Sequence, residues 1–124
     1  MIRVLIADDS VAIRDSLASL LNSTSGFLVV GLASDGLEAV EKASELLPDV
    51  VIMDAQMPNM DGVEATRRIK RDLPSVGVLF FSVFADYLEA SIVAGSDGYL
   101  NKDCSPSELF TEIRRIALGS QADP

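Results

Sequence analysis

Charged and polar side chains directly follow several apolar runs of this sequence. Asp8 and Asp9 follow the first run, Asp54 the third, Ser82 the fourth and Lys102 the fifth. A carboxylate at the end of a buried run must be paired, hydrated or bound to a cation, because an isolated buried charge is costly. The types of these five residues therefore raise the question of what they could do together.

The five groups would suit phosphoryl chemistry if they met at one place. Three neighbouring carboxylates repel one another and ionise together only with help from a cation. Oxygen ligands without His or Cys select a hard ion, and Mg²⁺ is the usual choice for phosphate work. A lysine can hold a phosphoryl oxygen as a point charge. A carboxylate in such surroundings, here Asp54, is suited to attack phosphorus and form an acyl phosphate.

The elements that must position these residues alternate between strand and helix patterns. Strand-like runs occupy residues 2–7, 27–33, 50–53, 76–81 and 98–101. Most of them are apolar throughout, which is typical of a parallel sheet covered on both faces. Between them, apolar residues recur at helical spacing. We therefore expect an α/β fold of five βα units, a doubly wound five-stranded parallel sheet with helices on both faces.

Helix-start signals support the same division of the chain. Asp35, Asp61 and Asp86 each stand three residues before a glutamate, and Ser105 opens a capping box with proline at the next position. Gly119 is expected just past the end of the last helix. Residues 1–118 are thus predicted as one domain and residues 119–124 as the start of a linker or a disordered tail.

This fold predicts that the chemically interesting side chains converge. In an open parallel sheet, ligands bind at the carboxyl ends of the strands. The residues that follow the first, third, fourth and fifth strands therefore share one edge. The second strand ends at Ser34 and Asp35, which we interpret as a helix cap.

Composition excludes several classes of function. The chain has 124 residues with a net charge of −9, which argues against direct binding to nucleic acid by this chain. Histidine is absent, so Ser-His-Asp and Cys-His catalysis and His-rich zinc sites are excluded. The single cysteine, Cys104, fits a reducing compartment. The apolar runs are too short to span a membrane, and we predict a cytoplasmic location.

Taken together, these features resemble the receiver domain of bacterial two-component response regulators over essentially the whole chain. The family has an acidic pair, an aspartate followed by M-P-x-M-D-G, a Ser or Thr and a lysine after successive strands, matched here by Asp8-Asp9, Asp54 with Met57 to Gly62, Ser82 and Lys102. Each motif alone is weak, but their combination in this order is specific. The segment DGYLNKD (residues 97–103) resembles the NarL/FixJ subgroup, whose members usually carry a C-terminal helix-turn-helix.

The resemblance implies the flavodoxin-like strand order 2-1-3-4-5 and a role for each site residue. Asp54 would accept a phosphoryl group from a kinase phosphohistidine. Mg²⁺ (or Mn²⁺) would be ligated by Asp9, Asp54 and the backbone carbonyl of Gln56, with Asp8 acting through water. The phosphoryl group would be held by Lys102, the Ser82 hydroxyl and the backbone N–H groups of Gln56 and Val83.

The resemblance also implies how a signal would leave the site. Tyr99 lies where the family keeps its aromatic switch. A rearrangement of Ser82 and Tyr99 would alter the surface formed by the fourth helix, fifth strand and fifth helix. Val83 is bulkier than the Ala or Ser common at its position, and Gln56 lies where side chains tune hydrolysis in the family. The lifetime of the phosphoryl group therefore stays open.

The partners implied are a sensor histidine kinase, a C-terminal helix-turn-helix output domain acting on DNA, and a second copy of the chain after phosphorylation. The chain would be a switch rather than an enzyme, catalysing only its own phosphorylation and dephosphorylation. The alternatives are an unphosphorylated receiver-like dimerisation module, which should lack an acid or the lysine, and a stand-alone single-domain regulator. A Mg²⁺-dependent phosphohydrolase is disfavoured because Gln56 stands where such enzymes carry a second aspartate. No glycine-rich nucleotide-binding loop follows any strand.

Overall fold

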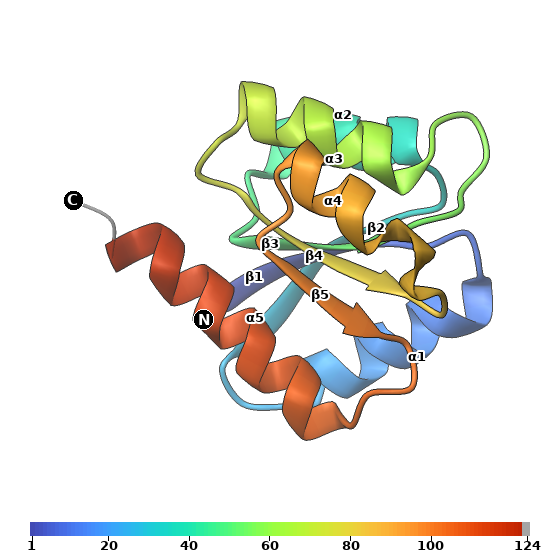
Figure 1. Cartoon of the computed structure of the whole chain (residues 1–124). Coiled ribbons are helices and arrows are strands. Elements are labelled where there is room, and N and C mark those ends of the chain that lie inside the picture. The colour runs from blue at the N-terminus through green and yellow to red at the C-terminus, as the bar shows by residue number, and fades with distance from the viewer. Residues whose placement is uncertain (123–124) are drawn as a thin grey trace.

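The structure, a computed structural model that describes residues 1–122, contains one five-stranded parallel sheet (Figure 1). Its strand order is β2-β1-β3-β4-β5. The strands are β1 (Ile2–Ala7), β2 (Phe27–Ala33), β3 (Val50–Asp54), β4 (Gly77–Ser82) and β5 (Gly98–Asn101). The predicted fold class and strand order are confirmed.

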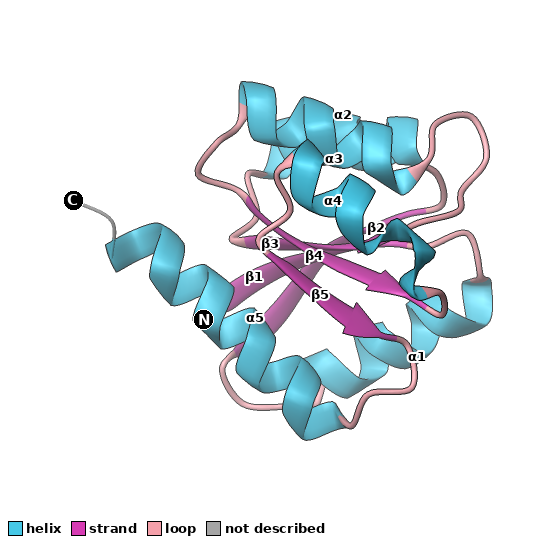
Figure 2. Cartoon of the chain, viewed as in Figure 1, coloured by secondary structure: helices cyan, strands magenta, loops and turns pink. Residues whose placement is uncertain are grey.

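Helices cover both faces of the sheet, as Figure 2 shows. They are α1 (Val11–Asn22), α2 (Gly36–Leu46), α3 (Gly62–Asp72), the short 3₁₀ helix η1 (Ala85–Tyr87), α4 (Leu88–Ala94) and α5 (Pro106–Ala122). One core lies between the sheet and the α2, α3 and α4 side, and the other lies between the sheet and α1 with α5. None of the helices in residues 1–122 combines the length and the hydropathy that a transmembrane helix needs.

Alternation along the central strands explains why their sequences are apolar throughout. In β3, Val51 and Met53 pack into the core under α2 and α3, whereas Val50 and Ile52 pack into the core under α1 and α5. Successive strand residues point to opposite faces, so a strand covered on both sides must be apolar at every position. The run VVIM is therefore the sequence of a central strand.

Strand register brings the predicted site residues side by side. Ala7 of β1 pairs with Met53 of β3, so the next residues, Asp8 and Asp54, are neighbours. Asp54 in turn pairs with Phe81 of β4, which directly precedes Ser82. The carboxyl edge of the sheet thus collects polar groups that lie far apart in the sequence.

Most of the predicted helix starts are confirmed by hydrogen bonds. The side chains of Asp35 and Asp61 accept from the backbone N–H groups of Glu38 at 2.7 Å and Glu64 at 2.9 Å. At α5, the Ser105 hydroxyl accepts from the N–H of Glu108 at 3.1 Å, and the Glu108 carboxylate accepts from the N–H of Ser105 at 3.3 Å. This reciprocal pair is a capping box.

Two boundary predictions are wrong. Asp86 does not cap a helix, because it lies inside η1, and neither η1 nor α4 has a side-chain cap hydrogen bond. Gly119 does not follow the last helix, since α5 continues through it to Ala122. An interior glycine costs a helix only about 1 kcal/mol, so it need not end one. Residues 119–122 therefore belong to α5, and residues 123 and 124 lie outside the described part of the chain.

The loop between β3 and α3 is held by close backbone contacts that require glycine. The N–H of Gly36 donates to the carbonyl of Met60, and the N–H of Gly62 donates to the carbonyl of Ala55, both at 2.9 Å. A Cβ atom at Gly62 would lie 1.9 Å from the carbonyl oxygen of Asp54, which is far inside contact distance. Glycine at this position therefore lets the loop pack against the residue that carries the central carboxylate.

We predict that Gly62→Ala lowers the free energy of unfolding by about 2 kcal/mol or more, because the backbone must shift to accept the methyl group. Chemical denaturation measures this change. Gly119→Ala is the matched control, because a Cβ there meets open space and alanine favours a helix. The control should be slightly more stable than the wild type. Equal stability of Gly62→Ala and wild type would contradict the packing described here.

Candidate functional site

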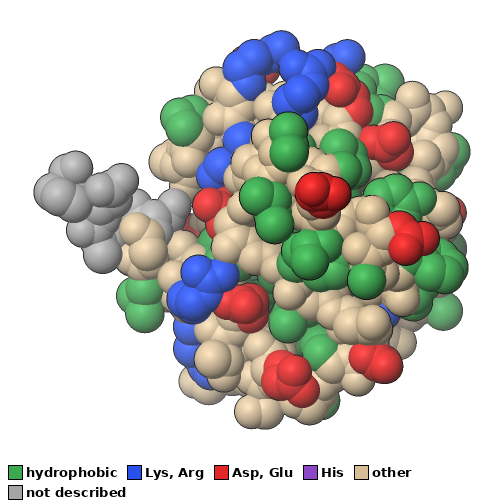
Figure 3. All heavy atoms as spheres, in the orientation of Figure 1, with side chains coloured by type: hydrophobic (Ala, Val, Ile, Leu, Met, Phe, Trp, Pro, Cys, Tyr) green, Lys and Arg blue, Asp and Glu red, His purple; other side chains and the backbone are tan. Residues whose placement is uncertain are grey.

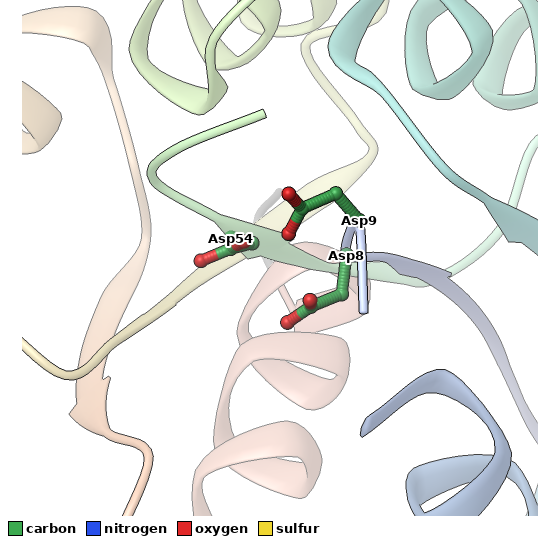
Figure 4. A group of neighbouring side chains, drawn as sticks. All are labelled: Asp8, Asp9 and Asp54. Carbon is green, nitrogen blue, oxygen red and sulfur yellow. The ribbon is translucent and has the colours of Figure 1, made fainter. Parts of the chain in front are cut away.

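Three carboxylates meet at the carboxyl edge of the sheet (Figure 4). Asp8 and Asp9 follow β1, and Asp54 is the last residue of β3. One oxygen from each lies within 4.8 Å of the others. Asp8 and Asp54 retain only 1% and 7% of their exposure, whereas Asp9 is exposed. Two buried acids and one accessible acid therefore face the same small volume.

Lys102 supplies the positive charge of this site. Its ammonium lies 2.8 Å from Oδ2 of Asp8 and 3.0 Å from Oδ1 of Asp54. Lys102 directly follows β5, so its long side chain reaches past the end of β4 to the two acids. The three groups form one buried ion cluster rather than separate surface charges.

Asp8 is held rigidly by its own surroundings. Its Oδ1 accepts from the N–H of Ser10 at 2.9 Å, and its backbone carbonyl accepts from the guanidinium of Arg14 at 2.7 Å. Its N–H donates to the carbonyl of Ala33 at the end of β2. These contacts fix the carboxylate before any ligand binds, which favours a preorganised site.

Ser82 is also buried and lies at the same edge. Its hydroxyl oxygen accepts from the N–H of Phe84 at 3.2 Å. Its backbone carbonyl accepts from the N–H of Lys102 at 3.0 Å, which joins the ends of β4 and β5. This hydrogen bond between the end of β4 and the residue after β5 therefore holds the serine and the lysine next to each other.

Burial and ion pairing shift the pKa values of the central pair. Burial raises the pKa of Asp54, the Lys102 ammonium opposes that rise, and the Asp8 carboxylate adds to it, so the net direction is upward. For Lys102, burial lowers the pKa, but its hydrogen bonds to Asp8 and Asp54 outweigh burial and the net shift is upward. The lysine therefore stays charged at neutral pH.

Tyr99 lies on β5, with its ring packed inside the sheet edge and its hydroxyl near the surface. The ring stacks on Phe80 with centroids 5.6 Å apart. The hydroxyl donates to the backbone carbonyl of Phe84 in the loop after β4. Tyr99 thus connects β5 to the same loop that carries the Ser82 hydrogen bond.

Two hollows open beside the cluster. The inner one, of about 200 Å³, is lined among others by Asp9, Asp54, Gln56, Ser82, Val83, Phe84 and Lys102. The outer one, of about 470 Å³, is lined by Asp9, Gln56, Asp61 and Tyr87, among others. Gln56 and Val83 are exposed at the rim. Asp61 caps α3, as expected, and does not belong to the carboxylate cluster.

One contact at the rim was missed by sequence reasoning. The side-chain amide of Gln56 donates to the Tyr87 hydroxyl at 2.7 Å. These residues are 31 positions apart, and Tyr87 ends a 3₁₀ helix where a regular helix was expected. No local pattern in the sequence indicates this pair.

The donor set fits a hard divalent cation. Each of the three clustered side chains offers a carboxylate oxygen, one of the acids is accessible from solvent, and neither His nor Cys is present among the clustered residues. Mg²⁺ prefers such oxygen ligands and keeps several of its own waters, which suits a shallow, partly open site.

Comparisons with known proteins place this arrangement in one family. The sequence profile described as "response regulator receiver domain" matches residues 4–114. The chain belongs to the response regulator receiver domain family. Receiver domains are signalling proteins of two-component systems, controlled by phosphorylation, and they bind Mg²⁺ through an acidic pocket.

Individual relatives agree with this assignment. The transcriptional regulatory protein LnrK of Bacillus subtilis is 40% identical over 126 residues, which cover 100% of this chain and 57% of LnrK. The receiver domain therefore spans little more than half the length of that relative.

Solved structures support the fold and the subgroup. The response regulator domain of Thermotoga maritima CheB superposes with a TM-score of 0.88 at 36% identity, and the match covers 100% of this chain and 99% of that domain. The receiver domain of NarL from Mycobacterium tuberculosis gives a TM-score of 0.89 at 30% identity, covering 95% and 97%. The resemblance to NarL/FixJ-like receivers is confirmed.

We predict that Asp54→Asn stabilises the receiver domain at neutral pH without divalent cations. Burial disfavours the ionised carboxylate, so the neutral amide should raise the free energy of unfolding and the Tm. A raised pKa in the folded state means that the wild type regains this stability as the pH falls, fully so below the ordinary value of 3.8. The difference between variant and wild type should therefore shrink on acidification.

Thermal unfolding of both proteins across the acidic range measures this effect. Asp15→Asn, at an exposed position on α1, is the control and should change Tm little at any pH. A lower Tm for Asp54→Asn at neutral pH would mean that pairing with Lys102 outweighs burial, which would contradict the prediction.

Proposed function

We propose that Asp54 of this receiver domain accepts a phosphoryl group from the phosphohistidine of a sensor histidine kinase. A carboxylate oxygen of Asp54 forms a bond to phosphorus as the bond from phosphorus to the imidazole nitrogen breaks. The electron pair leaves with the imidazole nitrogen, which takes up a proton from solvent. The observation that carries this proposal is the placement of the Lys102 ammonium 3.0 Å from a buried Asp54 carboxylate beside two further acids.

The surrounding groups would each hold one part of the transferred group. Lys102 lies close enough to Asp54 to pair with a phosphoryl oxygen on the same side. The Ser82 hydroxyl, which now accepts from Phe84, can rotate to donate to a second oxygen. Gln56 and Val83 line the inner hollow, and their backbone N–H groups would serve the remaining oxygens. These donors would offset charge that builds up during transfer.

Asp9, Asp54 and the backbone carbonyl of Gln56 would ligate Mg²⁺ (or Mn²⁺), with Asp8 acting through water. The exposure of Asp9 leaves one ligand accessible to an incoming ion, whereas Asp8 is already engaged by Lys102 and Ser10. When bound, the ion supplies positive charge that neutralises the transferring phosphoryl group. Lys102 provides the fixed part of the same compensation.

The signal would leave through Ser82 and Tyr99. Rotation of the Ser82 side chain toward the phosphoryl group would break the bond that it accepts from the N–H of Phe84, and Tyr99 donates to the carbonyl of that same residue. Both residues therefore act on one loop, which leads into α4. The result would be a shift in the population of two arrangements of the surface formed by α4, β5 and α5.

That surface has the apolar character of an interaction site. Side chains exposed in and next to η1 and α4 include Val83, Phe84, Leu88, Ile92 and Val93. Figure 3 shows hydrophobic side chains on this face. Exposed apolar groups gathered in this way mark interaction sites. We propose that this surface controls an output domain and supports phosphorylation-dependent homodimers.

For the full-length protein we propose a cytoplasmic transcription regulator with a C-terminal helix-turn-helix that contacts DNA. LnrK is a transcriptional regulatory protein and is longer than the receiver domain, which supports an output domain beyond that domain. The alternatives are a stand-alone single-domain regulator and an unphosphorylated dimerisation module. The apolar face supports dimerisation, but the complete set of acids and lysine favours phosphorylation.

We predict that incubation with Mg²⁺ and acetyl phosphate adds one phosphoryl group to the chain. Intact-mass spectrometry measures the adduct. Asp54→Asn should remain at its original mass, whereas Asp49→Asn, directly before β3, should be modified like the wild type. An adduct that survives in Asp54→Asn would place the reaction elsewhere, and a wild type without any adduct would refute the proposal.

We also predict that Mg²⁺ alone binds weakly and depends on Asp9. Adding Mg²⁺ should shift backbone NMR signals near Asp9 and Asp54 in the wild type, and Asp9→Ala should abolish those shifts. Asp61→Asn is the control, because Asn caps a helix as well as Asp does and Asp61 is not an expected ligand. Loss of the shifts in Asp61→Asn with the fold intact would make Asp61 a ligand and contradict the assignment.

A further inference from the structure

The rim of the site carries a side-chain hydrogen bond that the proposed chemistry does not use. Gln56, two residues after Asp54, donates from its amide to the Tyr87 hydroxyl at 2.7 Å. Gln56 belongs to the loop before α3, and Tyr87 is the last residue of η1. The bond therefore joins the two loops that lie on opposite sides of the inner hollow.

Gln56 stands where the two hollows meet. The inner hollow holds Asp54, Ser82 and Lys102, and the outer hollow is lined by Asp61 and Tyr87. Asp9, Ala55 and Gln56 line both. Of these three, Gln56 has the longest side chain, and its amide is bound to the Tyr87 hydroxyl. The Tyr87 hydroxyl therefore holds a side chain that lines both hollows.

Tyr87 is the residue that can fix Gln56 in this place. Its ring packs partly buried against the core on the α2 and α3 side, so the hydroxyl is presented from a supported position. Gln56 is exposed and has no other side-chain partner given by the structure among the described residues. Without the hydroxyl, the glutamine would sample several rotamers.

We propose that Tyr87 is a positioning residue that holds Gln56 across the mouth of the site and so slows both phosphorylation and loss of the phosphoryl group. This inference rests on the function proposed for Asp54. Loss occurs when a water oxygen bonds to phosphorus and the bond from phosphorus to the Asp54 oxygen breaks. The electron pair returns to the carboxylate, and both protons of the water leave with the phosphate, which is released as dihydrogen phosphate. Donor and water would both enter the inner hollow, which Gln56 lines.

The test compares wild type with Tyr87→Phe, which keeps the ring and removes the hydroxyl. Phosphorylation by acetyl phosphate with Mg²⁺ is followed by intact mass, and loss is followed after the donor is removed. Both rates should rise by about 2- to 10-fold, the range expected for losing one exposed hydrogen bond. Ser23→Ala is the matched control, because it also removes a hydroxyl from an exposed hydrogen bond, at the far end of the sheet. Its rates should equal those of the wild type.

A double-mutant cycle separates positioning from a merely structural role. Gln56→Ala should raise both rates, and adding Tyr87→Phe to it should change them no further, because Tyr87 acts through Gln56. A metal-free readout comes from NMR. In Tyr87→Phe, the side-chain amide signals of Gln56 should move toward those of a freely exposed glutamine, while the remaining spectrum stays close to wild type.

The outcomes distinguish failure of the positioning role of Tyr87 from failure of the function proposed for Asp54. If the wild type is phosphorylated and Tyr87→Phe leaves both rates unchanged, the positioning role of Tyr87 is refuted and the proposed function still stands. An effect of Tyr87→Phe that persists in the Gln56→Ala background also refutes that role. A rise in only one of the two rates contradicts the proposal that Gln56 slows both reactions. A wild type that gains no phosphoryl group overturns the proposed function and this inference together.

Discussion

The ammonium of Lys102 between Asp8 and Asp54 is the interaction on which the rest of the site depends. Strand register forces these two carboxylates to be neighbours, and burial denies them the screening that water would give. The lysine directly follows the edge strand β5 and still reaches both acids, so its salt bridges connect the ends of β1, β3 and β5 at the carboxyl edge. Folding therefore assembles the charge balance that phosphoryl transfer requires.

Much of this arrangement follows from the sequence. Runs such as VVIM are apolar at every position because helices cover both faces of the strand, and that pattern predicts a parallel sheet. The rule that ligands gather at the carboxyl ends of the strands then brings Asp54, Ser82 and Lys102 together. Local capping patterns at Asp35, Asp61 and Ser105 placed three helix starts correctly, because a cap depends on neighbours within one turn.

The features that escaped prediction depend on the path of loops. Asp86 has the spacing of a cap, yet the chain there forms a 3₁₀ turn that places Tyr87 beside Gln56 instead. Gly119 has the character of a helix end, but nothing in the surrounding structure stops α5 there. Long-range hydrogen bonds and helix extensions are decided by tertiary context, which a short window of sequence does not contain.

The glycine contacts at Gly36 and Gly62 make the two walls of the site unequal. On one side, backbone atoms of the β3–α3 loop meet other backbone atoms with no room for a side chain. On the other side, the loop after β4 is held through the hydroxyl groups of Ser82, Tyr87 and Tyr99, which can change partners. The site thus has one rigid wall and one wall that can rearrange. A bound ligand would move the loop between β4 and α4, so residues in that loop can differ between proteins with different partners while the β3–α3 loop stays the same.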